Sequence, residues 1–286
     1  MTIGLVLMGA LAAAALDLQA LWDFSRPAAS EQRFREALAT ASGDDALVLR
    51  TQIARTHGMR GDFDEARSLL AQVEPRLKNA GPEPRIRYEL EMGRTFASAT
   101  HPPGSRTPDA NARARGHFEA ALVLARQSRL DGLAIDAIHM MAFIDTAPTD
   151  QERWAREALA VVRASDQPAA TRWEASLRNN LGYALHQQGR HGEALEQFHE
   201  ALAIRERGTN ATATRTARWM VAWTLRALGR TDEALEIQLR LEREGDAAGE
   251  PDPHVFDELA HLYRTKGDEV RAAHYANRLR SPGGRP

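Results

Sequence analysis

A small residue, a glycine and an alanine recur along the chain in the same order and at the same distances. In four segments the glycine follows the small residue by seven positions, and the alanine follows the glycine by five. The four triplets are Ala54, Gly61 and Ala66; Gly182, Gly189 and Ala194; Ala222, Gly229 and Ala234; and Ala260, Gly267 and Ala272. We predict that each triplet marks an antiparallel helix pair. The small residues let the two helices approach closely, and the glycine ends the first helix in the left-handed conformation.

Polar residues after each glycine predict the start of the second helix. Asp62 with Glu65, and Thr231 with Asp232, are of the types that cap helix N-termini. We therefore expect the second helices of these pairs to begin with side-chain caps.

Two more segments fit the same pattern with changes. One contains Met92–Gly93 and carries an insertion, 101–108, in its turn. The other contains Met141–Ala142, and its second helix is predicted to open with a capping box from Thr149 to Glu152. Six helix pairs are therefore expected in all.

The pattern resembles the tetratricopeptide repeat, a helical hairpin of about 34 residues. The best copy runs from Asn180-Leu181-Gly182-Tyr183 through Gly189 and Ala194 to Phe198 and Ala201. Successive small residues of the first helices are 38 to 40 positions apart, with one step of 49. The array is therefore similar to the longer-helix variants found in bacterial regulators and kinesin light chains. The resemblance implies an all-α fold, a right-handed superhelical α-solenoid of antiparallel helix pairs.

The expected organisation has three parts. Residues 1–45 would form N-terminal capping helices, 46–280 about six helical hairpins, and 281–286 a flexible tail. The uncharged apolar run 3–16 has the length of a signal-peptide core but no basic residue before it, and it is too short for a membrane span. We expect a cytoplasmic protein, with export as the alternative if residues 1–15 act as a signal peptide.

Composition narrows the possible functions. With 43% hydrophobic and 27% charged residues the chain is typical of a folded, soluble protein, and its net charge of −2 gives no basic field for nucleic acid. The absence of cysteine excludes disulfide scaffolds, thiolate metal sites and cysteine nucleophiles. No catalytic or phosphate-binding motif occurs, and the histidines lack metal-ligand spacing. We predict no enzyme, no cofactor and no metal.

In tetratricopeptide proteins the first helices line a concave groove. The positions three and two before the small residue, and the one after it, tend to face that groove. With neighbouring positions included, the resemblance implies a partner-binding set: Arg55, Arg87, Glu91, Arg94, His139, Asn179, Asn180, Tyr183, Arg218, Trp219, Trp223, Asp257, Glu258 and His261.

This set suggests what kind of ligand the groove accepts. Arginines at one end and carboxylates at the other would create a charge gradient. Amide and aromatic groups in the middle suit a peptide backbone and an apolar anchor. Two alternatives stay open: Asn180 has a structural role, and Trp219 and Trp223 only pack between repeats.

The expected function is a non-catalytic scaffold that binds a protein or peptide in this groove. The alternative is a regulatory sensor whose superhelix closes on a small molecule or signalling peptide. The sequence does not identify the partner or the oligomeric state.

Overall fold

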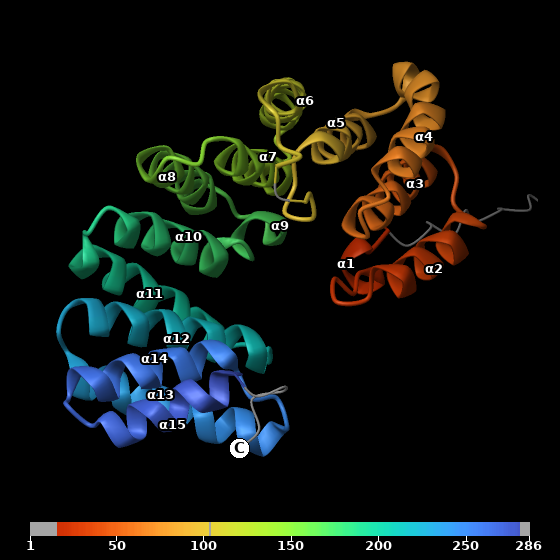
Figure 1. Ribbon diagram of the computed structural model, residues 1–286. Coiled ribbons are helices and arrows are strands. Elements are labelled where there is room, and N and C mark those ends of the chain that lie inside the picture. Colours follow the sequence, from red (N-terminus) through yellow and green to blue (C-terminus); the bar gives the residue numbers. More distant parts are fainter. Residues whose placement is uncertain (1–15, 103, 281–286) are drawn as a thin grey trace, which may run out of the picture. The chain divides into compact units, whose positions relative to one another are not determined.

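The computed structural model describes residues 16–102 and 104–280, and every regular element in these ranges is a helix (Figure 1). The expected all-α solenoid of helix pairs is confirmed. No described helix is both long and apolar enough to cross a membrane. The predicted N-terminal apolar run, up to residue 15, and the predicted tail, 281–286, lie outside the described residues.

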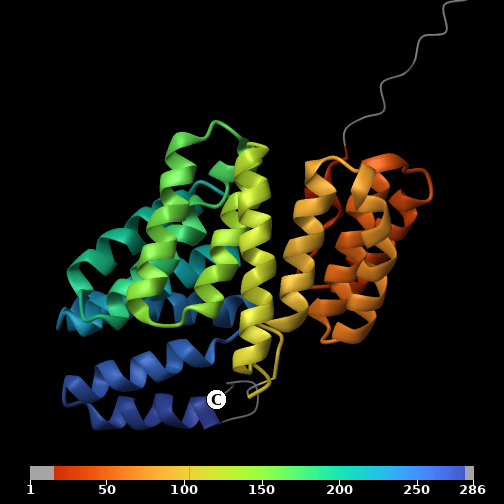
Figure 2. The ribbon, with the colours of Figure 1, turned by 90° about the horizontal axis from the view of Figure 1, so that it is seen from above.

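The chain forms two compact units, Met1–His117 and Phe118–Pro286. The elements of the first unit are α1 (Leu18–Leu21), α2 (Pro27–Leu38), α3 (Gly43–Met59), α4 (Phe63–Val73), the 3-10 helix η1 (Glu74–Asn79), α5 (Pro82–Phe96) and the first half of α6 (Pro108–Gln127). Helix α3 is the centre of this unit, because it packs against α2, α4 and α5. The orange helices α3 and α4 run side by side in Figure 2.

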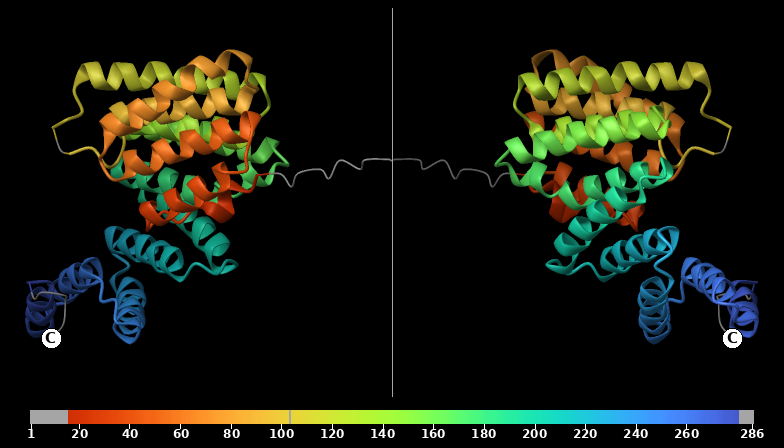
Figure 3. Two further views of the ribbon diagram at one scale, coloured as in Figure 1. Left: turned by 90° about the vertical axis from the view of Figure 1, so that its right-hand side faces the viewer. Right: turned by 90° about the vertical axis from the view of Figure 1, so that its left-hand side faces the viewer.

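The second unit contains the rest of α6 and nine further helices. These are α7 (Asp131–Ile144), α8 (Pro148–Ala164), α9 (Pro168–Thr171), α10 (Glu174–Gln187), α11 (His191–Glu206), α12 (Ala211–Ala227), α13 (Thr231–Ala248), α14 (Pro253–Thr265) and α15 (Glu269–Arg280). They pack as the pairs α7 with α8, α10 with α11, α12 with α13, and α14 with α15. The second helix of each pair also packs against the first helix of the next. The last pair, α14 and α15, is blue in Figure 3.

The predicted turn glycines all have the left-handed conformation. Their φ angles are +84° at Gly61, +75° at Gly189, +73° at Gly229 and +76° at Gly267. The N–H of the residue after each glycine donates to a carbonyl five positions earlier: Asp62 to His57, Arg190 to Leu185, Arg230 to Leu225, and Asp268 to Tyr263, all at 2.9 or 3.0 Å. Four first helices therefore end in the same Schellman-type turn, as predicted from the glycine spacing.

The small residue of the best repeat copy is needed for close packing. A Cβ added to Gly182 would lie only 2.7 Å from Cε1 of Phe198, a side chain that is 1% exposed. The corresponding residues Ala54, Ala222 and Ala260 are also buried. The sequence pattern thus identified the positions where first and second helices meet.

The predicted side-chain caps are wrong. Asp62 is an N-cap residue but makes no capping hydrogen bond, Thr231 is the first residue of α13, and α8 begins at Pro148, so that Thr149 lies inside the helix. At the starts of α4 and α13 the reason is the turn: the residue after the left-handed glycine, Asp62 or Arg230, has a ψ of 60° and not the extended backbone that a side-chain cap requires. At the start of α8 the N-cap residue is Ala147, whose side chain has no acceptor. An ion pair from Arg230 to Glu233 stands at the start of α13, with an N–O distance of 2.6 Å.

Candidate functional site

The second unit has a pocket between α7 and α10. Both helices pack on α8, and the short helix α9 packs against α7. The pocket has a volume of about 310 Å³, and residues of α8 line it together with those of α7 and α10. Four of its lining residues belong to the set predicted from the sequence: His139, Asn179, Asn180 and Tyr183. We refer to it as the α7–α10 pocket.

The walls of the α7–α10 pocket are apolar and aromatic. Ile138 and Phe143 come from α7, Trp154 from α8 and Leu177 from α10. The indole N–H of Trp154 donates to a carboxylate oxygen of Asp145 at 2.9 Å, which fixes the ring in place. None of the lining residues in the described part of the chain has a charged carboxylate, ammonium or guanidinium group. It therefore suits an uncharged group, because an unpaired charge would lose its hydration there.

A contact between two helices orients the amide at the pocket. Nδ2 of Asn180, on α10, lies 3.3 Å from Nδ1 of His139, on α7. An amide nitrogen only donates, so this contact requires the proton of the neutral imidazole to be on Nε2. The same ring lies edge-on to Phe143, with a centroid distance of 5.9 Å. The carbonyl oxygen Oδ1 of Asn180 makes no hydrogen bond to any residue that the structure describes.

Aromatic rings continue from the pocket onto the next repeat. Tyr183 stacks on Trp223 of α12 with a centroid distance of 6.1 Å, and Trp223 stacks on Trp219 at 5.7 Å. Trp219 also packs against the core cluster that contains Phe256, so packing between repeats accounts for part of its surface. Tyr183 is 45% exposed and leaves a ring face available beside the pocket.

His186 packs against this row of aromatic rings. Its ring stacks on Trp223 at a centroid distance of 3.4 Å. Burial, with smaller contributions from His191 and Arg226, lowers the pKa of His186 to about 4. The imidazole is therefore neutral near pH 7 and acts as an aromatic packing group.

The predicted acidic end of the groove is mostly engaged in ion pairs. Glu258 is 4% exposed and accepts two hydrogen bonds from Arg226, at 2.7 and 2.8 Å. Asp257 and His261 are exposed and lie 3.6 Å apart on adjacent turns of α14.

Arg218 is likewise engaged within the fold. It lies between Glu206 and Glu244, at 3.0 and 3.2 Å, and lines a second, more open and charged pocket at the start of α12. Arg218 and Glu258 thus stabilise contacts between helices.

The predicted residues of the first unit are also engaged in ion pairs. Glu91 is 3% exposed and lies 2.7 Å from Arg94 and 3.8 Å from Arg55. Arg87 pairs with Glu83 on its own helix at 2.8 Å. The charge gradient proposed from the sequence joins residues of both units and stays a prediction.

The side of α3 that was predicted to face a groove is in contact with the segment before α2. The indole N–H of Trp22 donates to Oε1 of Gln52 at 3.1 Å, and the guanidinium of Arg55 lies 5.4 Å from the Trp22 ring. Trp22 also packs edge-on against the buried Phe34 and stacks on Phe24. This contact was not predicted, because it joins residues 30 positions apart and Trp22 lies in a segment outside the repeats.

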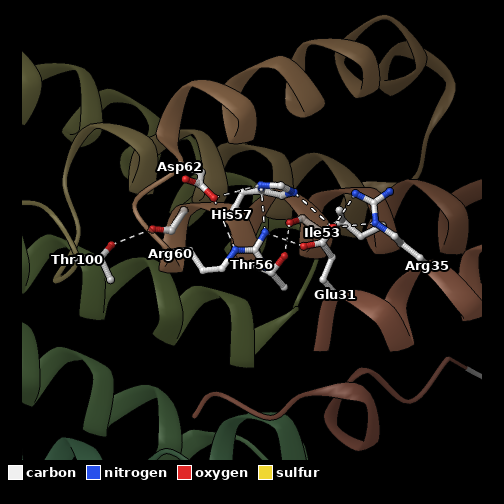
Figure 4. A network of polar contacts seen from close by, with 9 residues as sticks. Glu31, Arg35, Ile53, Thr56, His57, Arg60, Asp62 and Thr100 are labelled. Atoms are coloured by element: carbon white, nitrogen blue, oxygen red, sulfur yellow. Dashed lines mark hydrogen bonds and ion pairs between the residues drawn. The ribbon is translucent and has the colours of Figure 1, made fainter. Parts of the chain in front are cut away.

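A polar network holds the first repeat to α2 (Figure 4). Glu31 accepts hydrogen bonds from Arg35 and Arg60, at 2.8 and 2.7 Å, and lies 3.5 Å from His57. Burial opposes the ionised form, but the hydrogen bonds from the two arginines hold the pKa of Glu31 below its usual value. The network therefore connects α2 to the turn between α3 and α4 and has a structural role.

Comparisons with known proteins agree with this architecture. Residues 173–242 match the family model of the tetratricopeptide repeat. No curated protein matches the sequence. A signal transduction ATPase with numerous domains from Pyrococcus horikoshii, which has a tetratricopeptide repeat sensor, superposes with a TM-score of 0.66 at 13% identity. The match covers 88% of this chain but only 38% of that protein.

Two further solved structures are similar over most of the chain but superpose less well. NprR in complex with its cognate peptide NprX has a TM-score of 0.42 at 14% identity, covering 93% of this chain and 87% of that one. BtubC from P. vanneervenii has a TM-score of 0.40 at 15% identity, covering 92% and 90%. Scores at this level do not define a common arrangement of the repeats. The chain has an α-solenoid fold similar to that of tetratricopeptide repeat proteins, and residues 173–242 are the part that matches the family model.

Proposed function

We propose that this protein is a non-catalytic scaffold that binds an extended segment of another protein across α7, α10 and α12 of the second unit. The observation that carries the proposal is the α7–α10 pocket, an uncharged pocket of about 310 Å³ that has the side-chain amides of Asn179 and Asn180 in its lining. Its volume is at the lower end of pockets that hold ligands, so it would accept one large side chain.

The amide groups suit a peptide backbone. The side chain of Asn179 makes no hydrogen bond within the part of the chain that the structure describes, and the side chain of Asn180 makes only the one to His139. A side-chain amide both donates and accepts, and can therefore pair with the N–H and C=O groups of an extended chain.

The exposed ring of Tyr183 extends the surface toward Trp223 on the neighbouring repeat. Rigid aromatic rings beside a pocket are typical of residues that contribute most to binding energy at protein interfaces. A segment anchored in the pocket would pass over these rings toward α12.

The test is a selection from random-sequence peptides displayed on phage, with the full chain immobilised. We expect enriched peptides, and we expect the double variant Asn179→Ala/Asn180→Ala to lose at least tenfold in affinity for them. Gln187→Ala is the matched control, because this exposed residue lies on the same helix outside the pocket. Circular dichroism melting verifies that each variant is folded. No enrichment, or unchanged affinity of the double variant, would contradict the proposal.

A second candidate function is a regulatory sensor. The similarity to the Pyrococcus horikoshii protein, whose repeats are described as a sensor, favours it. In that case ligand binding would change the arrangement of the repeats. Small-angle scattering with a selected peptide would then show a smaller radius of gyration, whereas a scaffold that binds without rearrangement would keep its radius.

A further inference from the structure

Equivalent amide side chains in the two units differ in whether an aromatic residue is bound to them. Gln52 stands two residues before the small residue Ala54, and Asn180 stands two residues before Gly182. Both are amide side chains on a first helix. In the first unit, Oε1 of Gln52 accepts the indole N–H of Trp22 at 3.1 Å.

The side chain that lies beside the Trp22 ring, that of Arg55, also has a counterpart in the second unit. Arg55 follows Ala54 directly, and its guanidinium lies 5.4 Å from the centroid of the Trp22 ring. Tyr183 follows Gly182 directly and is 45% exposed. A side chain placed at Asn180 would therefore lie beside the open face of Tyr183, as Trp22 lies beside Arg55.

In the second unit nothing described occupies this position. Nδ2 of Asn180 contacts His139, and Oδ1 of the same amide has no hydrogen-bond partner among the described residues. The pocket beside it has walls formed by Phe143, Trp154 and Leu177. The site thus offers one acceptor at the edge of an apolar volume.

We propose that the α7–α10 pocket binds a tryptophan side chain from an extended segment of a partner protein, with the indole N–H donating to Oδ1 of Asn180. This inference rests on the proposed function and names the residue that the pocket selects. The uncharged lining disfavours acidic and basic side chains, which would be desolvated without a partner. Aliphatic and phenylalanine side chains would fill the volume but leave the amide oxygen without a donor.

The probes are N-acetyltryptophan amide and its analogue methylated at the indole nitrogen, titrated separately into the isotope-labelled full chain and followed by NMR. N-acetylphenylalanine amide is the third probe. We expect the tryptophan probe to shift the side-chain amide signals of Asn180. Because the methylated and phenylalanine probes lose one hydrogen bond, their affinity for the protein should be about fivefold to tenfold lower.

Three variants assign the effect to the pocket. Asn180→Ala should lower the affinity for the tryptophan probe by the same factor. In this variant the tryptophan probe and the methylated probe should bind equally well. Ala142→Leu fills the pocket from α7 and should abolish binding, and thermal melting reports whether it folds. Gln187→Ala should bind like the unchanged protein.

Equal affinity for the methylated and unmethylated probes, or full affinity in Asn180→Ala, would overturn the inference. The phage selection separates it from the proposed function. Enriched peptides without tryptophan would overturn the inference and leave the scaffold function standing. Failure to enrich any peptide would overturn the scaffold function itself, and with it the inference.

Discussion

Replacing Gly182 by alanine is expected to destabilise the second unit, although alanine is the better helix former. The new Cβ would lie 2.7 Å from Cε1 of Phe198, well below the 3.4 Å at which ordinary contact begins, and within 3.0 Å of two further ring atoms. Phe198 is 1% exposed and has no room to move away. Overpacking of this kind costs about 1–3 kcal/mol, whereas the gain in helix propensity is about 1 kcal/mol. We expect a net loss of up to about 2 kcal/mol.

The assay is urea denaturation followed by circular dichroism, with Gly192→Ala as the matched control. Gly192 lies in α11 of the same helix pair, and a Cβ there would meet nothing within 4 Å. Gly192 is the second residue of α11, so this variant should gain no more than about 0.5–1 kcal/mol from helix propensity. Both substitutions are in one helix pair, so the comparison does not require the whole array to unfold in a single step.

A second substitution tests whether the ring of Phe198 is the cause. Phe198→Leu removes ring atoms and is destabilising by itself, but it makes room for the methyl group of Gly182→Ala. The double variant should therefore be more stable than the sum of the two single effects indicates. The reasoning is refuted if Gly182→Ala is as stable as Gly192→Ala, or if the two effects simply add.

Three further predictions follow from the ion pairs, the buried histidine and the turns. Arg226→Ala should lower the free energy of unfolding by about 3 kcal/mol in urea denaturation, because it leaves the buried carboxylate of Glu258 unpaired; an unchanged midpoint would contradict this. The pKa of His186 is about 4 in the folded protein, against an ordinary value of 6.5, so the unfolded chain binds the proton first as the pH falls. Stability should therefore decrease from about pH 6.5 to pH 4, and His186→Phe should reduce this decrease in urea midpoints recorded across that range; an unchanged pH dependence would argue against the assignment. Gly189→Ala should cost about 1–2 kcal/mol, since φ is +75° there, and Gly189→Asn should cost less; equal melting temperatures for the two variants would count against it.

Much of the fold could be predicted because the repeat pattern reports local geometry. The spacing from Gly182 to Gly189 and Ala194 defines a close helix contact, a left-handed turn and a second close contact, and each is a property of a few neighbouring residues. The prediction of side-chain caps was wrong because the pattern of polar residues does not show which backbone conformation the turn imposes on the start of the next helix. The residue after Gly229 has a ψ of 60°, which no residue type reveals.

The candidate site could be predicted only in part, for a similar reason. The repeat register identified the helix face that carries His139, Asn179, Asn180 and Tyr183, and these four residues do line one pocket. It did not identify Trp154, because this contribution depends on α7 and α10 both packing on α8. Burial of Glu258 depends on its pairing with Arg226 from another repeat, which a single-helix pattern does not contain.

The four identical glycine turns have a consequence for how proteins of this type change length. The small residues of two neighbouring first helices, Gly182 in α10 and Ala222 in α12, are 40 positions apart, and both helices end in the same hydrogen-bonded turn. A duplication or deletion of one such 40-residue segment would join a second helix to a first helix through contacts of the kind already present between α11 and α12. Genetic gain or loss of whole repeats would therefore preserve the packing, whereas an insertion of one or two residues within a helix would rotate the rest of that helix away from its neighbours.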